Sequence, residues 1–244
     1  MASSQSSDPS LFDECVRDIN VAYQELGHTL GWRFLSVSRS VLDAPVKIAL
    51  ITINPAGKLI PADHPWASCE DGSSYLVERW GDAPSGRSTL QIQVQEMFSL
   101  LRLSIRFAGE TRELIEQSLI SHFVPFRSPR QDELPRKKES IAFGRRLWAR
   151  LLPCASPRLI ICLGRDVQRE LRKLIPGAMS ATRVDSKSFA TGWGEYTAEV
   201  DTYSAGRGTT RLLFLPHLST WTLFTSVTSM ANMPAILQAS ARGL

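Results

Sequence analysis

The chain has 244 residues, of which 43% are hydrophobic and 21% are charged, and 28 Lys and Arg against 24 Asp and Glu give a formal net charge of +4. Such a composition is ordinary for a globular protein. No apolar run approaches the roughly 20 residues that a membrane span needs, and residues 1–10 have neither the basic start nor the apolar core of a secretion signal. We therefore expect one cytoplasmic domain without a membrane partner, with residues 1–10 flexible.

The first part of the chain places one helix and one strand before a long polar segment. Apolar residues recur at helical spacing over 11–30, and an unbroken apolar run over 46–53 predicts a buried strand. The segment 58–87 is rich in Pro, Asp, Ser and Gly and contains three aromatic residues. Segments of this length inside a compact domain are usually functional. A helix pattern resumes over 88–101.

The middle of the chain alternates between the two patterns. Helical spacing over 110–118 is followed by a strand pattern over 119–126, and an amphipathic helix over 136–152 is followed by an apolar strand over 157–164. A further helix is predicted at 165–174. This alternation is typical of parallel strands that are joined by helical crossovers.

The last part of the chain changes in character before one more core strand. Ser, Thr and Gly mix with alternating residues over 181–210, which predicts an antiparallel hairpin. A strand over 211–215 and a closing helix over 219–239, kinked or interrupted at Pro234, complete the pattern. We expect an α/β domain of three layers, α/β/α, with a central four-stranded parallel sheet and the hairpin as a small antiparallel insertion before the last core strand.

Each predicted parallel strand ends in a polar side chain or a turn of small residues. The four endings are Asn54-Pro55, Arg127-Ser128, Gly164 and His217. Because the carboxyl ends of parallel strands lie along one edge of the sheet, Asn54 and His217 are expected to meet there as a candidate active site. Two plainer interpretations stay open: Asn-Pro is a common turn opener, and a histidine at a strand end can be purely structural.

The order and spacing of these motifs resemble the uracil-DNA glycosylase superfamily. Residues 52–57, Thr-Ile-Asn-Pro-Ala-Gly, resemble the Asn-Pro-Gly form of the family's water-positioning motif. Residues 216–219, Pro-His-Leu-Ser, resemble its His-Pro-Ser motif with Leu218 in place of proline. Residues 121–127 and 159–164 are similar to the family's second and third strands. The resemblance implies a DNA partner and a monofunctional DNA glycosylase.

The chemistry of base removal fits these residue types. Breaking the bond between base and sugar develops positive charge on the sugar and negative charge on the base. The resemblance implies that Asn54 orients the attacking water and that His217 donates a hydrogen bond to the departing base. No amine nucleophile is evident at a strand end, so we expect hydrolysis that leaves an abasic site without strand cleavage.

The resemblance also implies which residues bind the substrate after the base has been flipped out of the helix. It assigns the base contacts to Pro55, Ala56, Gly57, His122 and Phe126. It assigns the DNA contacts to Arg127, Ser128, Gly164, Arg165, Leu218, Ser219 and Trp221. The apolar wedge that helps to extrude the base would be Leu218, Trp221 or Leu223.

Two departures from the uracil-specific pattern bear on the base. Ala56 stands where that branch has a bulky Tyr, which leaves the C5 side of a pyrimidine open. His122 stands where an Asn normally reads uracil, so a uracil site would lose paired hydrogen bonds. We therefore expect excision of a modified or damaged base, and in the narrowest form a hypermodified cytosine of phage DNA, which would be antiphage defence.

Alternatives stay open at this point. The protein could be a conventional repair glycosylase for uracil or another deaminated base, a noncatalytic nucleic-acid-binding module, or a hydrolase of free nucleosides or nucleotides. Basic residues cluster over 127–150 and 165–173, which favours a polymeric anion as partner, although solvated helix faces explain single residues equally well.

No cofactor is expected. The four histidines show no ligand spacing and the cysteines include no Cys-x-x-Cys pair, so neither a metal nor an iron-sulfur cluster is indicated. The four cysteines are Cys15, Cys69, Cys154 and Cys162.

Overall fold

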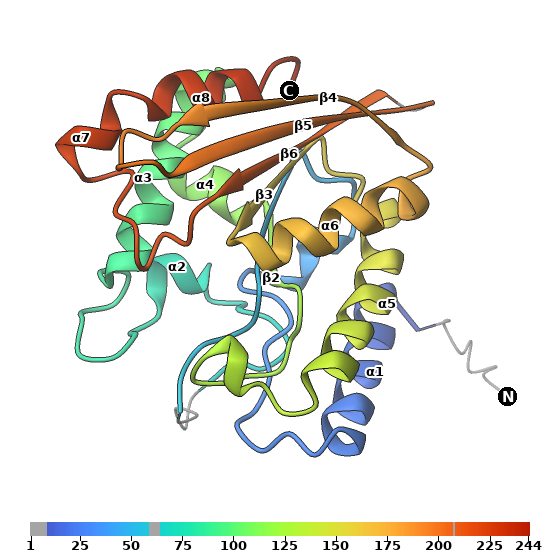
Figure 1. Cartoon of the computed structure of the whole chain (residues 1–244). Coiled ribbons are helices and arrows are strands. Elements are labelled where there is room, and N and C mark those ends of the chain that lie inside the picture. The colour runs from blue at the N-terminus through green and yellow to red at the C-terminus, as the bar shows by residue number, and fades with distance from the viewer. Residues whose placement is uncertain (1–8, 59–63, 207) are drawn as a thin grey trace, which may run out of the picture.

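A six-stranded sheet organises the protein, in the strand order β2-β1-β3-β6-β5-β4 (Figure 1). The computed structural model describes residues 9–58, 64–206 and 208–244. The strands are β1 Ile48–Thr52, β2 Leu119–His122, β3 Leu159–Leu163, β4 Thr182–Ala190, β5 Thr197–Ala205 and β6 Gly208–Leu215. The α-helices are α1 Leu11–Glu25, α2 Ser74–Val77, α3 Thr89–Ser104, α4 Thr111–Glu116, α5 Lys137–Ala155, α6 Arg165–Ala178, α7 Val227–Met230 and α8 Met233–Ser240. Of the residues 1–10 expected to be flexible, 1–8 lie outside the described part.

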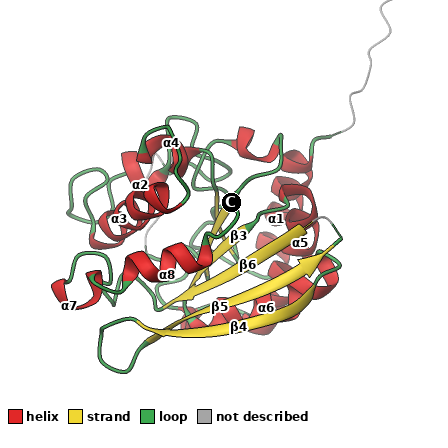
Figure 2. Ribbon diagram, turned by 90° about the horizontal axis from the view of Figure 1, so that it is seen from above, coloured by secondary structure: helices red, strands yellow, loops and turns green. Residues whose placement is uncertain are grey.

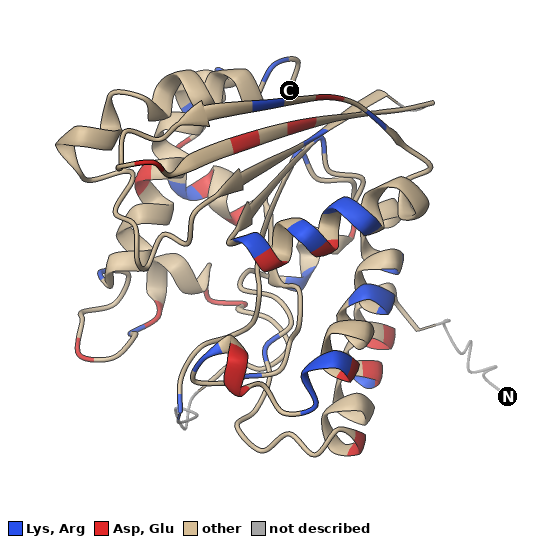
Figure 3. Cartoon of the chain, in the orientation of Figure 1, with Lys and Arg blue, Asp and Glu red and all other residues tan. Residues whose placement is uncertain are grey.

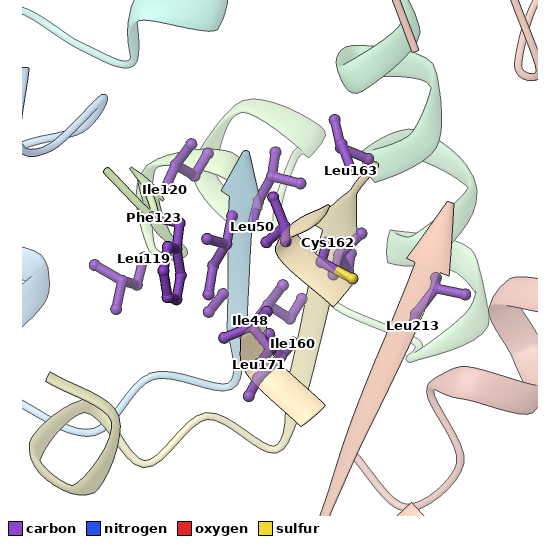
Figure 4. Close-up of a cluster of buried hydrophobic side chains, with 14 of the residues drawn as sticks. Ile48, Leu50, Leu119, Ile120, Phe123, Ile160, Cys162, Leu163, Leu171 and Leu213 are labelled. Atoms are coloured by element: carbon purple, nitrogen blue, oxygen red, sulfur yellow. The ribbon is translucent and has the colours of Figure 1, made fainter. Parts of the chain in front are cut away.

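The parallel half of the sheet consists of the four apolar runs found in the sequence. Strand β1 pairs in parallel with β2 and β3, and β3 pairs in parallel with β6. Every residue of β1 and β3 is buried. Side chains of these strands and of α6 form the cluster shown in Figure 4. Burial on both faces explains why these strands are continuously apolar instead of alternating.

Helices lie on both faces of the sheet, which makes the sheet the middle one of three layers (Figure 2). Helices α3, α4 and α8 pack together on one face, and α5 and α6 pack together on the other. The chain leaves β1 toward β2 but leaves β3 toward β6. With right-handed crossovers this reversal places the connecting helices on opposite faces. It also opens a crevice at the carboxyl ends of β1 and β3, which is where open α/β sheets bind ligands.

Local chemistry sets the ends of several helices. The Ser10 side chain accepts a hydrogen bond from the backbone of α1, and Ser88 with Gln91 forms a reciprocal capping box at the start of α3. Gly164 has a φ of 100° and lets the chain turn from β3 directly into α6. A residue with a Cβ would be strained in this conformation.

The antiparallel hairpin is present but is more than a small insertion. Strands β4 and β5 pair with each other, and β5 continues the main sheet by pairing antiparallel to β6. The expected α/β class is confirmed, but the expectation of a four-stranded, wholly parallel sheet is only partly met, because the sheet is six-stranded and mixed. The physical reason is that β6 would otherwise expose an unpaired edge.

The expected closing helix over 219–239, kinked or interrupted at Pro234, is only partly present. Residues 216–226 form turns, α7 is a single short helix, and α8 begins only at Met233 with Pro234 in its first turn. Proline lacks a backbone N–H, which the first turn of a helix does not need. Pro234 therefore starts a helix instead of bending one.

Candidate active site

A cavity of about 360 Å³ opens at the carboxyl ends of the parallel strands. Strand ends contribute Thr52, Asn54, Pro55, Ala56, Gly57, His122, Arg127 and His217 to its lining. The long polar segment contributes His64, Tyr75, Glu78, Arg79, Trp80 and Gly81, and Arg33, Ser36 and Leu90 complete the lining. Its size falls within the range of about 300–1,000 Å³ that is typical of small-molecule sites. Asn54 and His217, which the sequence places at the ends of two parallel strands, both line this cavity.

The side-chain amide of Asn54 is held in one orientation. Its Nδ2 donates to the backbone oxygen of Pro55 at 2.9 Å and to Ser128 Oγ at 2.9 Å. A carbonyl oxygen can only accept, so the nitrogen of the amide must face Pro55. Ser128 Oγ in turn donates to the backbone oxygen of Arg130 at 2.7 Å. Asn54 Oδ1 is thereby left as the acceptor of the pair.

The imidazole of His217 is also held in one tautomer. The backbone N–H of Ser219 donates to His217 Nδ1 at 3.3 Å, and Ser219 Oγ lies 2.8 Å from the same nitrogen. Since a backbone N–H can only donate, Nδ1 carries no proton and the proton is on Nε2. Burial lowers the pKa of His217 below its usual value of 6.5. The neutral ring therefore offers Nε2–H as a hydrogen-bond donor.

His122 lies beside Thr52 at the inner wall of the cavity. The two residues are partners in the parallel register of β1 and β2, and His122 Nδ1 is 2.6 Å from Thr52 Oγ1. Burial, then the nearby Arg33 and Arg127, keeps the pKa of His122 well below 6.5. The expected base-binding residue is thus a neutral imidazole on the cavity wall.

A buried ion pair forms the wall opposite the strand ends, and the sequence reasoning missed it. Arg33 is 4% exposed, and its Nη1 lies 2.7 Å from Glu78 Oε1. Arg33 Nη2 lies 2.8 Å from His64 Nδ1, and Trp80 Nε1 donates to Glu78 Oε2 at 2.9 Å. A charged residue inside the apolar run 32–35 was the available signal, because a buried arginine needs a partner.

Arg127 contacts this wall, although it was predicted to contact DNA. Its Nη2 lies 3.1 Å from His64 Nε2, and its Nη1 donates to the backbone oxygen of Ala56. Burial, followed by Arg33 and Arg127, lowers the pKa of His64 to about 4. A neutral His64 therefore separates two guanidinium groups at the cavity.

Three apolar side chains are not where the sequence predicted them. Phe126 is fully buried and stacks on His28 with ring centroids 4.2 Å apart, so the prediction that it contacts a base is wrong. Leu218 and Leu223 are both fully buried, so neither presents a wedge to a partner. In each case the side chain packs in the hydrophobic core, although its position in a motif suggested that it contacts the substrate.

Trp221 remains at the surface, in an aromatic cluster. Its ring centroid lies 4.0 Å from that of Tyr196 and 6.0 Å from that of Trp193, so the turn of the β4–β5 hairpin reaches the segment after β6. The backbone N–H of Trp221 donates to the oxygen of His217 at 3.0 Å. The hairpin thereby supports the segment that carries His217.

The other predicted DNA contacts are mostly occupied by contacts within the protein. Ser128 is buried and holds Asn54, whereas Ser219 is exposed but bonds to His217. Arg165 pairs with Glu199 and lies over the ring of Phe214. Of these residues, Arg165 and Ser219 are exposed.

The basic clusters are largely neutralised by neighbouring acids. Figure 3 shows blue and red residues interspersed along α6. Arg145 pairs with Glu170 at 2.6 Å, and Arg172 pairs with Asp201 at 2.6 Å. The pattern over 127–150 and 165–173 therefore reflects ion pairs between elements more than a free basic face.

Several features outside the cavity complete the description. Every described helix is too short or too polar to span a bilayer. Within 9–58, 64–206 and 208–244, no group of three His, Cys, Asp or Glu side chains is arranged to hold a metal ion. All four cysteines are free thiols, and burial raises the pKa of Cys15 to about 11 and of Cys69 to about 12.

The chain matches no protein-family model, and comparison with curated proteins finds no significant similarity.

Proposed function

We propose that the protein is a monofunctional DNA glycosylase that removes a modified or damaged base and leaves an abasic site. The observation that carries the proposal is the shared cavity, in which an amide fixed as an acceptor and an imidazole fixed as a donor come from opposite ends of the chain. This pair matches the two charges that develop when a base leaves a sugar.

Each member of the pair has a defined part in the proposed reaction. Asn54 Oδ1 accepts a hydrogen bond from water and aims the oxygen of that water at the anomeric carbon. His217 Nε2–H donates to an oxygen of the base, on which negative charge accumulates as the bond to the sugar breaks. An amide is too weak a base to take a full proton, so the reaction depends on a good leaving group and turnover is modest.

The cavity wall supports a substrate larger than uracil. Ala56 leaves one side of the cavity without a bulky side chain, and the long polar segment adds Glu78, Arg79 and Trp80 to the lining. Polar and aromatic groups of this kind can receive a hydroxyl-rich or sugar-bearing substituent. The narrower proposal is a hypermodified cytosine of phage DNA, as part of antiphage defence in the cytoplasm, and repair of uracil or other deaminated bases is the conventional alternative.

A panel of oligonucleotides tests the proposal. Each carries one target base, namely uracil, hypoxanthine, 5-hydroxymethylcytosine or its glucosylated form, and alkali cleavage reports abasic sites. We expect product from at least one modified base and little from uracil. His217→Ala should abolish this product while retaining the thermal unfolding midpoint. Strong activity on uracil alone would contradict the narrower proposal, and no product from any base would contradict the glycosylase.

A hydrolase of free nucleosides is the second candidate. The specific observation in its favour is that acidic neighbours pair with Arg145, Arg165 and Arg172, which reduces the basic surface that DNA would need. The same panel offered as free nucleosides distinguishes the two, because release of base from nucleosides but not from oligonucleotides would favour this candidate. Binding of oligonucleotides without release of any base would instead indicate a noncatalytic module.

A further inference from the structure

One ring nitrogen on the cavity wall has no fixed hydrogen-bonding role. His122 ends β2 and Thr52 ends β1, the two are paired in the sheet, and both line the cavity. Thr52 Oγ1 lies 2.6 Å from His122 Nδ1. Within the described part of the chain, no hydrogen bond is found for the other ring nitrogen, Nε2, which leaves it for a ligand.

The hydroxyl of Thr52 permits either direction for this hydrogen bond, because a hydroxyl both donates and accepts. When Thr52 donates to Nδ1, the imidazole proton is on Nε2 and Nε2 is a donor. When Nδ1–H donates to Thr52, Nε2 is a bare acceptor. Both arrangements preserve the bond between the two side chains and require a neutral ring, which burial of His122 favours.

His217, in the same cavity, is an example of an imidazole whose tautomer is fixed by its neighbours. The backbone N–H of Ser219 can only donate to His217 Nδ1, so Nε2 of His217 is always a donor. His122 has a rotatable hydroxyl in the equivalent place. The two imidazoles therefore differ in one respect: the group behind His217 dictates its tautomer, and the group behind His122 does not.

We propose that Thr52 and His122 form an adaptable reader of the base edge, which accepts pyrimidines carrying either an oxygen or an amino group at the position that faces His122. This inference rests on the proposed function and names its substrate class: modified pyrimidines of both the uracil type and the cytosine type. An asparagine reader discriminates strongly, because the wrong base leaves buried donors or acceptors unpaired. A nitrogen that can change its role avoids this penalty with either base.

Two substrates that differ only at this edge test the proposal. Oligonucleotides carrying 5-hydroxymethyluracil or 5-hydroxymethylcytosine in one sequence context should give wild-type kcat/KM values within about tenfold of each other, because neither base leaves a buried group unpaired. Thr52→Val keeps the branched shape but removes the hydroxyl. Since a buried N–H without an acceptor is rarer than a buried acceptor without a donor, Nδ1 then loses its proton and Nε2 becomes a donor only.

In Thr52→Val, kcat/KM for the cytosine-type base should fall about tenfold or more relative to the uracil-type base, because the amino group then faces a donor. Thr52→Ser, which retains a hydroxyl, should restore the wild-type ratio. An unchanged ratio in Thr52→Val would overturn the proposal, and so would a loss that is equal for both bases.

A second measurement does not depend on catalysis. The ¹⁵N shifts of the His122 ring report its tautomer, and wild-type protein titrated with free 5-hydroxymethyluracil should show the proton on Nε2, whereas free 5-hydroxymethylcytosine should show it on Nδ1. The same tautomer with both bases, or no response to either, would overturn the proposal. If both tautomers appear but no oligonucleotide loses a base, the glycosylase proposal fails and the reader stands.

Discussion

The parallel half of the sheet and the antiparallel hairpin differ in how completely their polar side chains are hydrogen-bonded. At the ends of the parallel strands, Asn54 and His217 are each held on one side by the protein and are open to the cavity on the other. On the antiparallel hairpin, Asp201 is 1% exposed and bonds to both Arg172 and Ser186. Oriented but partly unsatisfied polar groups therefore line the cavity at the parallel strand ends, whereas the buried carboxylate of Asp201 on the hairpin is paired on both of its oxygens.

This difference separates function from stability. A polar group that is oriented but not saturated can bind a ligand without first breaking a contact, so it is preorganised for chemistry. A buried and fully paired charge contributes little to binding, but the loss of its partner is costly. Substitutions in the parallel half are expected to change activity, and those in the hairpin half are expected to change stability.

The largest effect is expected at the parallel strand ends. Under the proposed function, Asn54→Ala removes the group that orients the attacking water. Base release should then fall about 100- to 1,000-fold, the range seen when one positioned transition-state contact is removed. Its thermal midpoint should stay near that of the wild type. Asn232→Ala is the matched control, because Asn232 is half-buried, donates from its side chain to the backbone oxygen of Ala190 and does not line the cavity. Equal activity of the two variants would contradict a catalytic role for Asn54.

A substitution at the hairpin should lower stability and leave the activity of the folded protein unchanged. Arg172→Met retains most of the side-chain stem but leaves the buried Asp201 carboxylate without its closest cation, which should cost about 3 kcal/mol in the free energy of unfolding. Urea denaturation measures this loss. Arg169→Met is the control, because its closest partner Asp166 is partly exposed. The buried Glu170, 3.8 Å from Arg169, keeps Arg145 as its closer cation at 2.6 Å, so little change is expected. The activity that survives per folded molecule should equal that of the wild type.

Mild acid should destabilise the folded protein through two buried histidines that lie outside the hairpin. Burial lowers the pKa of His28 and of His64 from 6.5 to about 4. Between these values the unfolded chain takes up protons that the folded protein does not, so stability falls as the pH falls below 6.5. Each histidine should remove about 2 kcal/mol between pH 6.5 and pH 5.

Denaturation across this pH range with the variant His28→Gln isolates one of the two histidines. The slope of stability against pH should become shallower, because one proton fewer is taken up on unfolding. An unchanged slope would show that the pKa of His28 is the same in the folded and the unfolded protein. Arg172→Met should leave the slope in this range as it is in the wild type.

The smallest effect is expected at Arg165, which the sequence placed on DNA. Because this arginine pairs with Glu199 at a partly exposed position, Arg165→Gln should cost less than about 1 kcal/mol in stability. Its affinity for an oligonucleotide should match the wild type, and so should the dependence of that affinity on salt. A flatter salt dependence would show that Arg165 meets a phosphate after all.

The prediction from sequence was most accurate where side-chain pattern and burial agree. The continuously apolar runs at 46–53 and 157–164 became β1 and β3, because strands covered on both faces have no other composition available. The polar residues that end β1 and β6 were found for the same reason, since a change from apolar to polar marks the point where a strand leaves the core. The closing helix was misjudged, because Pro234 fits both a kink and a first turn.

The sequence by itself determined the α/β class and the polar residues that follow the apolar runs of β1 and β6, because hydrophobic periodicity is a local property of a chain. Tertiary structure alone decided that Phe126, Leu218 and Leu223 belong to the core. It also decided that Arg33 and Glu78 line the cavity, and that Arg145, Arg165 and Arg172 pair with acids on other elements. These outcomes depend on contacts between residues that are far apart in the sequence. Such contacts decide which side chains are buried and which charges are paired, but they produce no repeating pattern in the sequence.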